Sequence, residues 1–237
     1  MLLPNERVEI VRFCRRMQAD DLTVGSSGNL SVRSGNRIAI TPSGVAFEDL
    51  TATSICVVDL NGNPVEEGLP PSSEVPMHTR VYARTDAVAV VHTHPLYATT
   101  LSTVVDELPA VHHKLALLGG AVRVAPYAAY GSIELADNSV RAMEGRFGAI
   151  LQNHGATTYG DRLAKAYSRS LYLEWVCRLY YQSRLLGEPS MLPAEEVEQA
   201  ARKLGSQGQT VLDPLPMARP WTTGPRRGRD DNGTGGE

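Results

Sequence analysis

The sequence predicts a single domain of the α/β class, and three observations support this prediction. Short apolar runs with strand character alternate along the chain with longer segments whose apolar residues recur at helical spacing. The chain has 237 residues, of which 42% are hydrophobic, so it is long enough to bury a sizeable core. Neither an internal repeat nor a flexible linker divides it. We expect the domain to span residues 1–213 and residues 214–237, which are rich in proline, glycine and arginine, to form a disordered tail.

The N-terminal part of the chain predicts a helix, a group of strands and a second helix. Apolar residues recur at helical spacing over residues 5–20, with Asn5 as the predicted N-cap. Turn residues then separate short runs that have strand character. These runs predict strands over residues 30–33, 37–41, 55–60 and 87–91. The second helix is predicted over residues 73–83, with Ser72 or Ser73 as its cap.

The C-terminal part predicts two more strands and four more helices. Asp161 is predicted to open the longest helix and Gly187 to close it. Two glutamates stand in the first turn of the last helix, where the helix dipole favours negative charge. The strands are expected over residues 121–124 and 148–152, and the helices over residues 96–104, 133–145, 161–187 and 194–204.

Composition excludes several classes of partner. The formal net charge of −3 and the isoelectric point near 6.1 provide no basic surface for nucleic acid or anionic lipid. No stretch approaches the roughly 18 apolar residues that a membrane helix needs, and the N-terminus lacks the pattern of a secretory signal. The cysteines, Cys14, Cys56 and Cys177, are odd in number and far apart, so we interpret them as buried, reduced thiols. We therefore expect a cytoplasmic protein that binds neither nucleic acid nor membrane.

The stretch VVHTHPLY at residues 90–97 is the first candidate for chemistry. Side chains two apart in a strand point to the same face, so His92 and His94 can converge on one ion. By itself this pair is a weak signal, because histidines at a strand end are often structural. An open zinc site needs a third protein ligand, and His154 follows another predicted strand in the segment LQNHGAT. Spacing alone leaves the metal site and the structural interpretation both open.

Three loops combine serine with glycine or with a helix start. They are GSSGN at residues 25–29, TPSG at 41–44 and PPSSE at 70–74. Each can be an ordinary turn or cap, and Glu74 can be an ordinary residue of a helix start. Loops of this kind can also hold a phosphate through backbone N–H groups and hydroxyls. Neither a P-loop nor a GxGxxG pattern is present, which argues against nucleotide binding.

Taken together, these motifs resemble a known family. The segments GSSGNLSVR, ITPSG, PSSE, VVHTHPLYATTLS, APYAAYG and LQNHG occur in the order found in the class II aldolase/adducin family, most closely in its L-fuculose-phosphate aldolase branch. The resemblance covers about residues 5–205. It implies a three-layer αβα sandwich around a largely antiparallel mixed sheet. It also implies a homotetramer with active sites at the subunit boundaries.

The resemblance assigns roles by position. His92, His94 and His154 match the zinc ligands, with another divalent metal as the alternative cofactor, and Glu74 matches the catalytic acid/base. The positions that match the site for the substrate phosphate are Ser26, Asn29, Ser43, Gly44, Ser72 and Ser73. We place His78 outside the metal ligands, as a residue behind them or in the core, and we interpret His112 as structural.

Two positions depart from the family pattern. His113 stands where the fuculose-type aldolases have a proton-donating tyrosine, and a second tyrosine near the C-terminus falls at Gln207. Histidine exchanges protons near neutral pH more readily than a phenol, so we assign the second acid/base role to His113. This departure puts the sugar specificity in doubt.

The implied function is a zinc-dependent aldolase. It would cleave a ketose 1-phosphate similar to L-fuculose 1-phosphate into dihydroxyacetone phosphate and an aldehyde. A sugar-phosphate 4-epimerase and a methylthioribulose-phosphate dehydratase of the same family are the alternatives, and a non-catalytic adducin-like module is a further one. Products distinguish the enzymes from one another, and metal content distinguishes them from the module. The aldehyde, the native metal and the role of the tail stay open at this stage.

Overall fold

Eight strands form one mixed sheet in the order β3-β2-β1-β4-β8-β7-β6-β5. The computed structural model describes residues 1–206. Gln207 and the expected tail from residue 214 lie outside the described residues. All neighbouring strands are antiparallel except β6 and β7, which are parallel. The strands are β1 (Asn29–Ser34), β2 (Arg37–Ile40), β3 (Cys56–Asp59), β4 (Ala89–Thr93), β5 (Glu107–Leu108), β6 (Val122–Ala125), β7 (Gly148–Leu151) and β8 (Gly155–Gly160).

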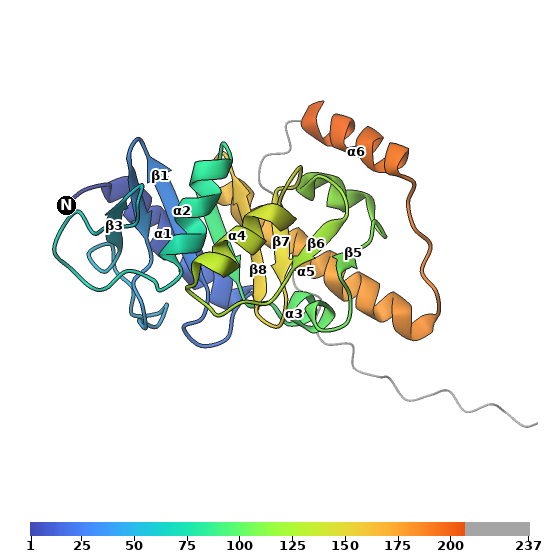
Figure 1. Ribbon diagram of the computed structural model, residues 1–237, viewed down its shortest axis with the longest axis horizontal. Helices are drawn as coiled ribbons and strands as arrows, with labels where there is room; N and C mark the ends of the chain where they lie inside the picture. Colours follow the sequence, from blue (N-terminus) through green and yellow to red (C-terminus); the bar gives the residue numbers. More distant parts are fainter. Residues whose placement is uncertain (207–237) are drawn as a thin grey trace, which may run out of the picture.

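Helices cover both faces of this sheet, which confirms the expected three layers (Figure 1). α2 and α4 pack on one face, while α1 and α5 pack on the other, with α3 and a 3₁₀ helix, η1, beside α5. The helices are α1 (Pro4–Ala19), α2 (Val75–Arg84), α3 (Leu96–Ser102), η1 (His113–Leu118), α4 (Ile133–Ala142), α5 (Leu163–Leu186) and α6 (Ala194–Ser206). Within residues 1–206, none of these helices is long and apolar enough to cross a membrane.

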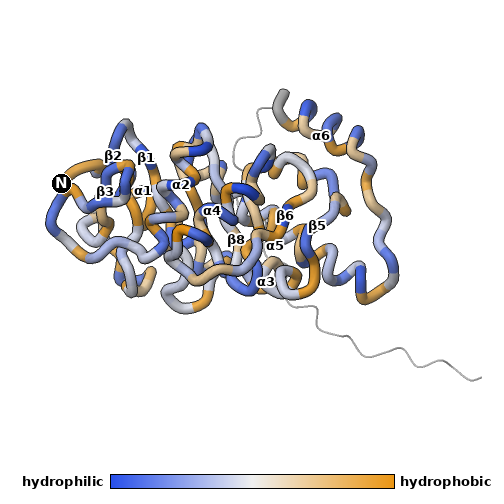
Figure 2. The backbone as a smooth tube through the Cα atoms, in the orientation of Figure 1, coloured by the Kyte–Doolittle hydropathy of each residue, from blue (hydrophilic) through white to orange (hydrophobic). Residues whose placement is uncertain are grey.

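The strand β4 lies at the centre of the sheet and decides which face each histidine side chain takes. Val90 belongs to the core under α2 and α4, whereas Ala89 and Val91 belong to the core under α1 and α5. His92 follows with the parity of Val90, so its ring lies on the α2 side. Figure 2 shows hydrophobic chain through the middle of the molecule and hydrophilic residues mostly at the outer turns. The alternation of side chains between the two faces of β4 therefore sets the face on which His92 lies.

The main error in the sequence-based assignment concerns β8, which was not predicted. Its segment GATTYG has β-branched and aromatic residues between two glycines, a pattern that does favour a strand. The strand lies between β4 and β7 and is buried along its whole length. Gly155 directly follows a predicted strand, a position typical of a turn, and the polar threonines weaken the strand pattern after it.

Three predicted helix starts were also wrong in detail. The first helix begins at Pro4 after Leu3, so Asn5 lies inside it and is not the N-cap. α2 has Glu74 at its N-cap position, with no side-chain cap, although Ser72 Oγ accepts a hydrogen bond from the N–H of Glu74 at 3.2 Å. α5 begins after Arg162 rather than after Asp161. In each case the difference is one or two residues, which is within the usual variation of helix boundaries.

Candidate metal centre

The strands β1, β4, β8 and β7 are neighbours, and their termini meet at one end of the sheet. β1 and β8 both run antiparallel to β4, so the start of β1, the end of β4 and the start of β8 lie together. In the ladder, Asn29 is opposite His92, and His92 is opposite Thr157. His94 comes directly after β4, and His154 lies in the tight connection between β7 and β8. Antiparallel pairing thus brings residues about sixty positions apart to the same edge.

The three imidazole rings face one another in a nearly regular triangle. The ring centroids of His92, His94 and His154 are 4.8, 4.9 and 4.9 Å apart, and the ring planes cross at 73°, 68° and 89°. Glu74 completes the group, and the four donor atoms lie within 4.8 Å of one another. The structure therefore brings together the four residues that the sequence singled out for the metal and the acid/base.

Two glycines permit the close backbone approach that this triangle needs. A Cβ atom at Gly155 would lie 2.2 Å from the carbonyl oxygen of Thr93, a distance that real side chains essentially never adopt. Gly28 has φ +86°, and a Cβ there would lie 2.9 Å from the carbonyl oxygen of His92. Larger residues would push the β7–β8 connection and the start of β1 away from the histidines.

The hydrogen-bond pattern leaves lone pairs directed into the centre of the triangle. Nδ1 of His92 lies 3.1 Å from the carbonyl oxygen of Ala156, which can only accept, so Nδ1 carries the proton whenever the ring is neutral. The unprotonated Nε2 of His92 then lies 2.9 Å from Nε2 of His94 and 3.0 Å from Oε2 of Glu74. Oε1 of Glu74 is buried without a hydrogen-bond partner and lies 3.5 Å from Nε2 of His154. Such mutually facing acceptors are stable only around a cation or a shared proton.

The spacing of these atoms fits a tetrahedral metal. Ligand atoms 2.0–2.1 Å from a tetrahedral zinc are about 3.3 Å from one another. The separations of 2.9, 3.0 and 3.5 Å between these donors bracket that value. Three imidazole nitrogens with the Glu74 carboxylate beside them are therefore a donor set that fits a divalent ion with nitrogen and oxygen ligands.

The site favours the protonation states that bind metal. Burial, followed by the charges of His92 and His154, lowers the pKa of His94 to about 3, and burial with the charge of His92 lowers that of His154 to about 4. Burial alone would raise the pKa of Glu74. The charge and hydrogen bond of His92 in its protonated form, together with the hydrogen bond from Asn29, outweigh burial and lower this pKa well below its usual range. Neutral imidazoles beside an ionised carboxylate present lone pairs to a cation.

A cleft of about 180 Å³ opens beside the triangle. Glu74, His94 and His154 line it, whereas His92 is completely buried beneath. All of the predicted phosphate-binding residues line the same cleft, namely Ser26, Asn29, Ser43, Gly44, Ser72 and Ser73. Tyr130 also lines it, and it was not predicted from the sequence. Among the described residues that line this cleft, none is a lysine or an arginine.

His113 does not reach this site within one chain. It is exposed at the start of η1, which packs against α5 and α6, and it does not line the cleft. Its neighbour His112 accepts a hydrogen bond from the N–H of Lys114 and packs edge-on against Trp175. These contacts of His112 match its interpretation as a structural residue.

Buried polar residues behind Glu74 were largely missed in the sequence. Asn29 Nδ2 donates to Oε2 of Glu74 at 2.9 Å, and Asn29 Oδ1 lies 2.5 Å from Nε2 of His78. Ser31 and Tyr82 continue this chain, and neither was singled out from the sequence. The available signal was the four-residue spacing of Glu74, His78 and Tyr82, which places them on one stripe of a helix.

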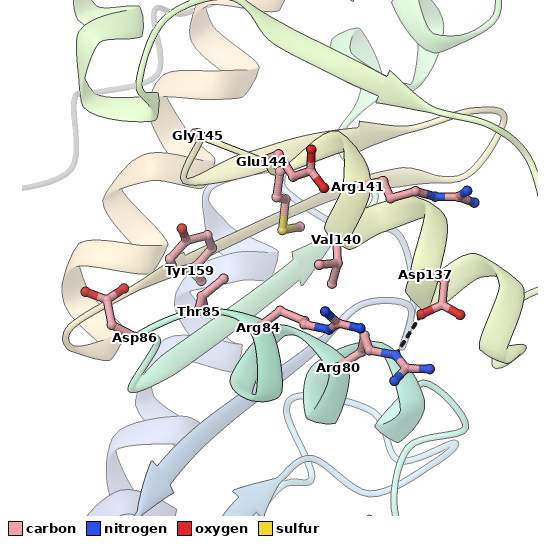
Figure 3. Close-up of a pocket in the computed structure, with 11 residues that line it drawn as sticks. Arg80, Arg84, Thr85, Asp86, Asp137, Val140, Arg141, Glu144, Gly145 and Tyr159 are labelled. Atoms are coloured by element: carbon pink, nitrogen blue, oxygen red, sulfur yellow. Dashed lines mark ion pairs between the residues drawn. The ribbon is translucent and has the colours of Figure 1, made fainter.

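A larger cleft of about 660 Å³ lies elsewhere, between the C-terminal parts of α2 and α4 (Figure 3). Its charged lining is balanced, because it contains three arginines and three carboxylates. Arg80 Nε lies 2.7 Å from Asp137 Oδ1, and both side chains are partly exposed. The charged residues are Arg80, Arg84, Arg141, Asp86, Asp137 and Glu144. None of the residues predicted to bind metal or phosphate lines this cleft.

A mixed sheet with three imidazoles and a carboxylate at one edge is an arrangement suited to a metal-dependent enzyme. The sequence pattern of the class II aldolase and adducin N-terminal domain matches residues 8–181, and the chain belongs to this family. A 5-deoxy-D-ribulose 1-phosphate aldolase from Bacillus thuringiensis is 37% identical over 88% of this chain and 100% of its own length. A 5-methylthioribulose-1-phosphate/5-deoxyribulose-1-phosphate aldolase from Rhodospirillum rubrum is 34% identical over 91% of this chain and 100% of its own.

A solved structure of similar sequence has the same fold. The structure of an L-fuculose 1-phosphate aldolase is 40% identical, covers 85% of this chain and 96% of its own, and superposes with a TM-score of 0.83. The family match, these aldolase relatives and the cluster of three histidines and Glu74 make the chain a class II, metal-dependent aldolase, a carbon–carbon lyase.

Proposed function

We propose that this aldolase uses zinc to cleave a ketose 1-phosphate reversibly into dihydroxyacetone phosphate and an aldehyde. One observation carries the proposal: three imidazoles and an orphaned carboxylate oxygen converge beside a small cleft lined with serines. His92, His94 and His154 would hold the ion, and Glu74 lies beside it. Nitrogen donors at tetrahedral spacing favour zinc over magnesium or calcium.

When bound, zinc would supply Lewis-acid stabilisation of the negative charge that develops as the carbon–carbon bond changes. The protein's own residues would do the rest. In the direction of synthesis, the Glu74 carboxylate takes a proton from the hydroxymethyl carbon of dihydroxyacetone phosphate. That carbon then forms a bond to the aldehyde carbon, and the aldehyde oxygen takes up a proton. Cleavage runs through the same steps in reverse, so the carbon that receives the proton is C3 of the ketose.

The phosphate would be held by neutral donors. Gly44 has φ +71°, and its backbone N–H has no acceptor among the described residues. The N–H of Ser73, at the start of α2, is in the same situation. The N–H of Ser43 already donates to the carbonyl of Pro70, so its hydroxyl is the group free to contact an anion. N–H and O–H groups can hold the phosphate dianion, and so orient the substrate, without a buried cation.

The names of the relatives narrow the substrate class. Deoxyribulose 1-phosphate, methylthioribulose 1-phosphate and fuculose 1-phosphate all lack a hydroxyl on the carbon chain's last atom. We therefore infer a ketose 1-phosphate whose aldehyde half ends in an apolar group. Tyr130, which is 76% exposed at the rim of the cleft, offers an apolar ring to that end of the substrate.

His113 would act from a neighbouring subunit. The chemistry needs a second acid/base for the aldehyde oxygen, and His113 is exposed and away from the cleft of its own chain. A homotetramer with active sites at the subunit boundaries, as expected from the family, would bring this ring to the next subunit's cleft. The buried free thiols of Cys14, Cys56 and Cys177 support the cytoplasm as the compartment.

The direct test is to incubate the zinc-loaded protein with 5-deoxyribulose 1-phosphate and with L-fuculose 1-phosphate, and to identify every product. We expect dihydroxyacetone phosphate and an aldehyde in equal amounts from at least one of them. Recovery of a 4-epimer would favour the epimerase instead, and loss of water would favour the dehydratase. The same protein treated with a chelator is the control, and it should release no aldehyde.

A further inference from the structure

A ladder of polar side chains fills the space between β1 and α2 behind Glu74. Glu74, His78 and Tyr82 are four residues apart and lie along one stripe at the start of and within α2. Asn29 and Ser31 are two residues apart in β1 and point to the same face of the sheet. All five are buried, with at most 5% of any residue exposed. The two sets alternate along the ladder from Glu74 to Tyr82.

The direction of every hydrogen bond in this ladder is fixed by chemistry. The ionised Glu74 carboxylate only accepts, so Asn29 must turn its amide N–H toward Oε2 and its oxygen toward His78. That oxygen also only accepts, so Nε2 of His78 carries the proton. The unprotonated Nδ1 of His78 then accepts from the hydroxyl of Ser31 at 2.6 Å. Ser31 in turn accepts from the hydroxyl of Tyr82 at 2.7 Å.

The His78 ring is neutral in this arrangement. Burial, together with the charge of His92, lowers the pKa of His78 to about 3. The ladder therefore places no second positive charge beside the metal site. Its effect on Glu74 is geometric: Oε2 is tied to Asn29, whereas Oε1 has no hydrogen-bond partner and faces His154 at 3.5 Å. Oε1 is thus the oxygen left free to carry a proton.

We propose that His78 is a positioning residue, which acts through Asn29 to hold Glu74 with Oε1 directed at the reacting carbon. Ser31 and Tyr82 serve the same purpose one step further away, because they lock the His78 tautomer. The inference rests on the proposed function of Glu74 as the proton carrier. It also gives the Asn29 side chain a role in addition to the phosphate contact expected from its sequence position, since one N–H and the oxygen of its amide are engaged in the ladder.

Two substitutions of His78 test the proposal. His78→Phe keeps the ring shape and removes the donor to Asn29, while His78→Gln keeps an N–H near the position of Nε2. With zinc-loaded protein, we expect His78→Phe to lower kcat by roughly 10²-fold, because a small displacement of a catalytic group has that effect. KM and zinc content should stay within about twofold, and His78→Gln should recover most of kcat. Equal losses in both variants, or an unchanged kcat in His78→Phe, would overturn the proposal.

Exchange of hydrogen between dihydroxyacetone phosphate and D₂O isolates the step that Glu74 performs. The rate of deuterium entry at the hydroxymethyl carbon should fall in His78→Phe by the same factor as kcat. If exchange stays at the wild-type rate while cleavage falls, Glu74 is positioned normally and the proposal is wrong.

A matched pair of serines controls for the loss of a buried hydroxyl. Ser170 lies on the opposite face of the sheet and bonds to Thr158 Oγ1 at 2.7 Å, and it is as completely buried as Ser31. Ser170→Ala removes one such bond and Ser31→Ala removes two, those to His78 and Tyr82, but only Ser31→Ala should lower kcat. This pair also decides the question if His78→Phe does not fold. An unchanged kcat in Ser31→Ala would then overturn the proposal.

Nitrogen NMR of the metal-free wild-type protein gives a readout that does not depend on activity. His78 should show a protonated Nε2 and an unprotonated Nδ1, and the reverse tautomer would contradict the ladder. If the wild-type enzyme neither cleaves a ketose 1-phosphate nor exchanges deuterium, the proposed function fails, and the NMR result still decides whether the ladder exists.

Discussion

The two ends of α2 lie in two different clefts. At its N-terminal end, Glu74 is 5% exposed and borders a cleft of about 180 Å³. At its C-terminal end, Arg80 and Arg84 line a cleft of about 660 Å³, nearly four times as large, where Arg80 pairs with Asp137 (Figure 3). The larger cleft holds charged groups that are near water and balanced by opposite charges. The smaller one holds buried lone pairs that face one another.

By this contrast, the orientation of desolvated groups, and not cleft size, singles out the candidate site. A solvated ion pair such as Arg80–Asp137 has its electrostatic needs met by its partner and by water. Oε1 of Glu74 and the Nε2 atoms of the histidines have neither, so their arrangement is unfavourable until a cation or a substrate completes it. Four substitutions test this comparison, and they follow in order of expected effect.

Removal of one imidazole should have the largest effect. We expect His94→Ala to lose zinc affinity by more than about 10²-fold, because loss of a partner behind a metal ligand already costs 10–100-fold. Aldolase activity should be lost with the metal. Zinc content after dialysis measures the effect, and Arg84→Ala, at the other end of α2, is the control that should keep full stoichiometry. Equal zinc content in both variants would contradict the role of His94.

Neutralisation of Glu74 should affect the reaction more than the metal. Glu74→Gln keeps the shape of the side chain but cannot take up a proton, so kcat should fall by about 10²–10⁴-fold. The three imidazoles remain, and zinc should still bind. Steady-state kinetics with metal-loaded protein measures the fall, with Asp137→Asn in the larger cleft as the matched control. An active Glu74→Gln enzyme would assign the proton transfer to another group.

A second buried carboxylate, that of Glu174, sharpens the comparison because both of its oxygens are satisfied. They accept hydrogen bonds from the N–H groups of Tyr97 and Ala98 at 2.8 and 2.9 Å, at the start of the helix that follows His94. Burial nevertheless raises the pKa of Glu174 to about 7 from an ordinary 4.5. Between these two values the folded protein holds a proton that the unfolded chain has released. The contribution of this group to the free energy of unfolding is therefore fully present below pH 4.5, and it is lost as the pH rises to about 7.

The variant Glu174→Gln should lack this pH dependence. Relative to wild type, its free energy of unfolding should rise by roughly 2–3 kcal/mol between pH 5 and pH 8. Urea unfolding of both proteins at pH 5, 6.5 and 8 measures the difference. Parallel stability curves for the two proteins would show that Glu174 does not titrate in this range.

Disruption of the exposed ion pair should have the smallest effect. The side chains of Arg80 and Asp137 are 34% and 46% exposed, so water screens their attraction. We expect Arg80→Ala to change the free energy of unfolding by less than about 1 kcal/mol and to leave zinc content and kcat unchanged. A large loss of activity in this variant would give the larger cleft a function that its balanced charges do not suggest.

Local patterns in the sequence were sufficient for most of the fold and for the members of the metal cluster. Apolar periodicity predicted α1, an uninterrupted apolar run predicted β4, and the two-residue spacing of His92 and His94 made them candidates for one face of the sheet. The order of the motifs then added Glu74 and His154. These signals are local, or they depend on a set of motifs that few folds share. The strand β8 was missed because its threonines and flanking glycines resemble a turn when their neighbours in the sheet are unknown.

The ladder behind Glu74 could not be predicted in the same way. It depends on the position of α2 along β1. Only this position brings His78 to Asn29 and Tyr82 to Ser31. A shift of α2 by one turn would pair different residues without any change in the helical pattern. The role of His113 is a comparable case, since one chain does not contain the surface on which it would act.

The central claim is that His92, His94 and His154 bind one divalent ion next to Glu74. Anomalous X-ray diffraction at the zinc edge, from crystals of the zinc-loaded protein, tests it most directly. We predict a single strong peak per chain, bonded to the Nε2 atom of each of the three histidines. The absence of a peak there, or a peak coordinated by other residues, would contradict the account.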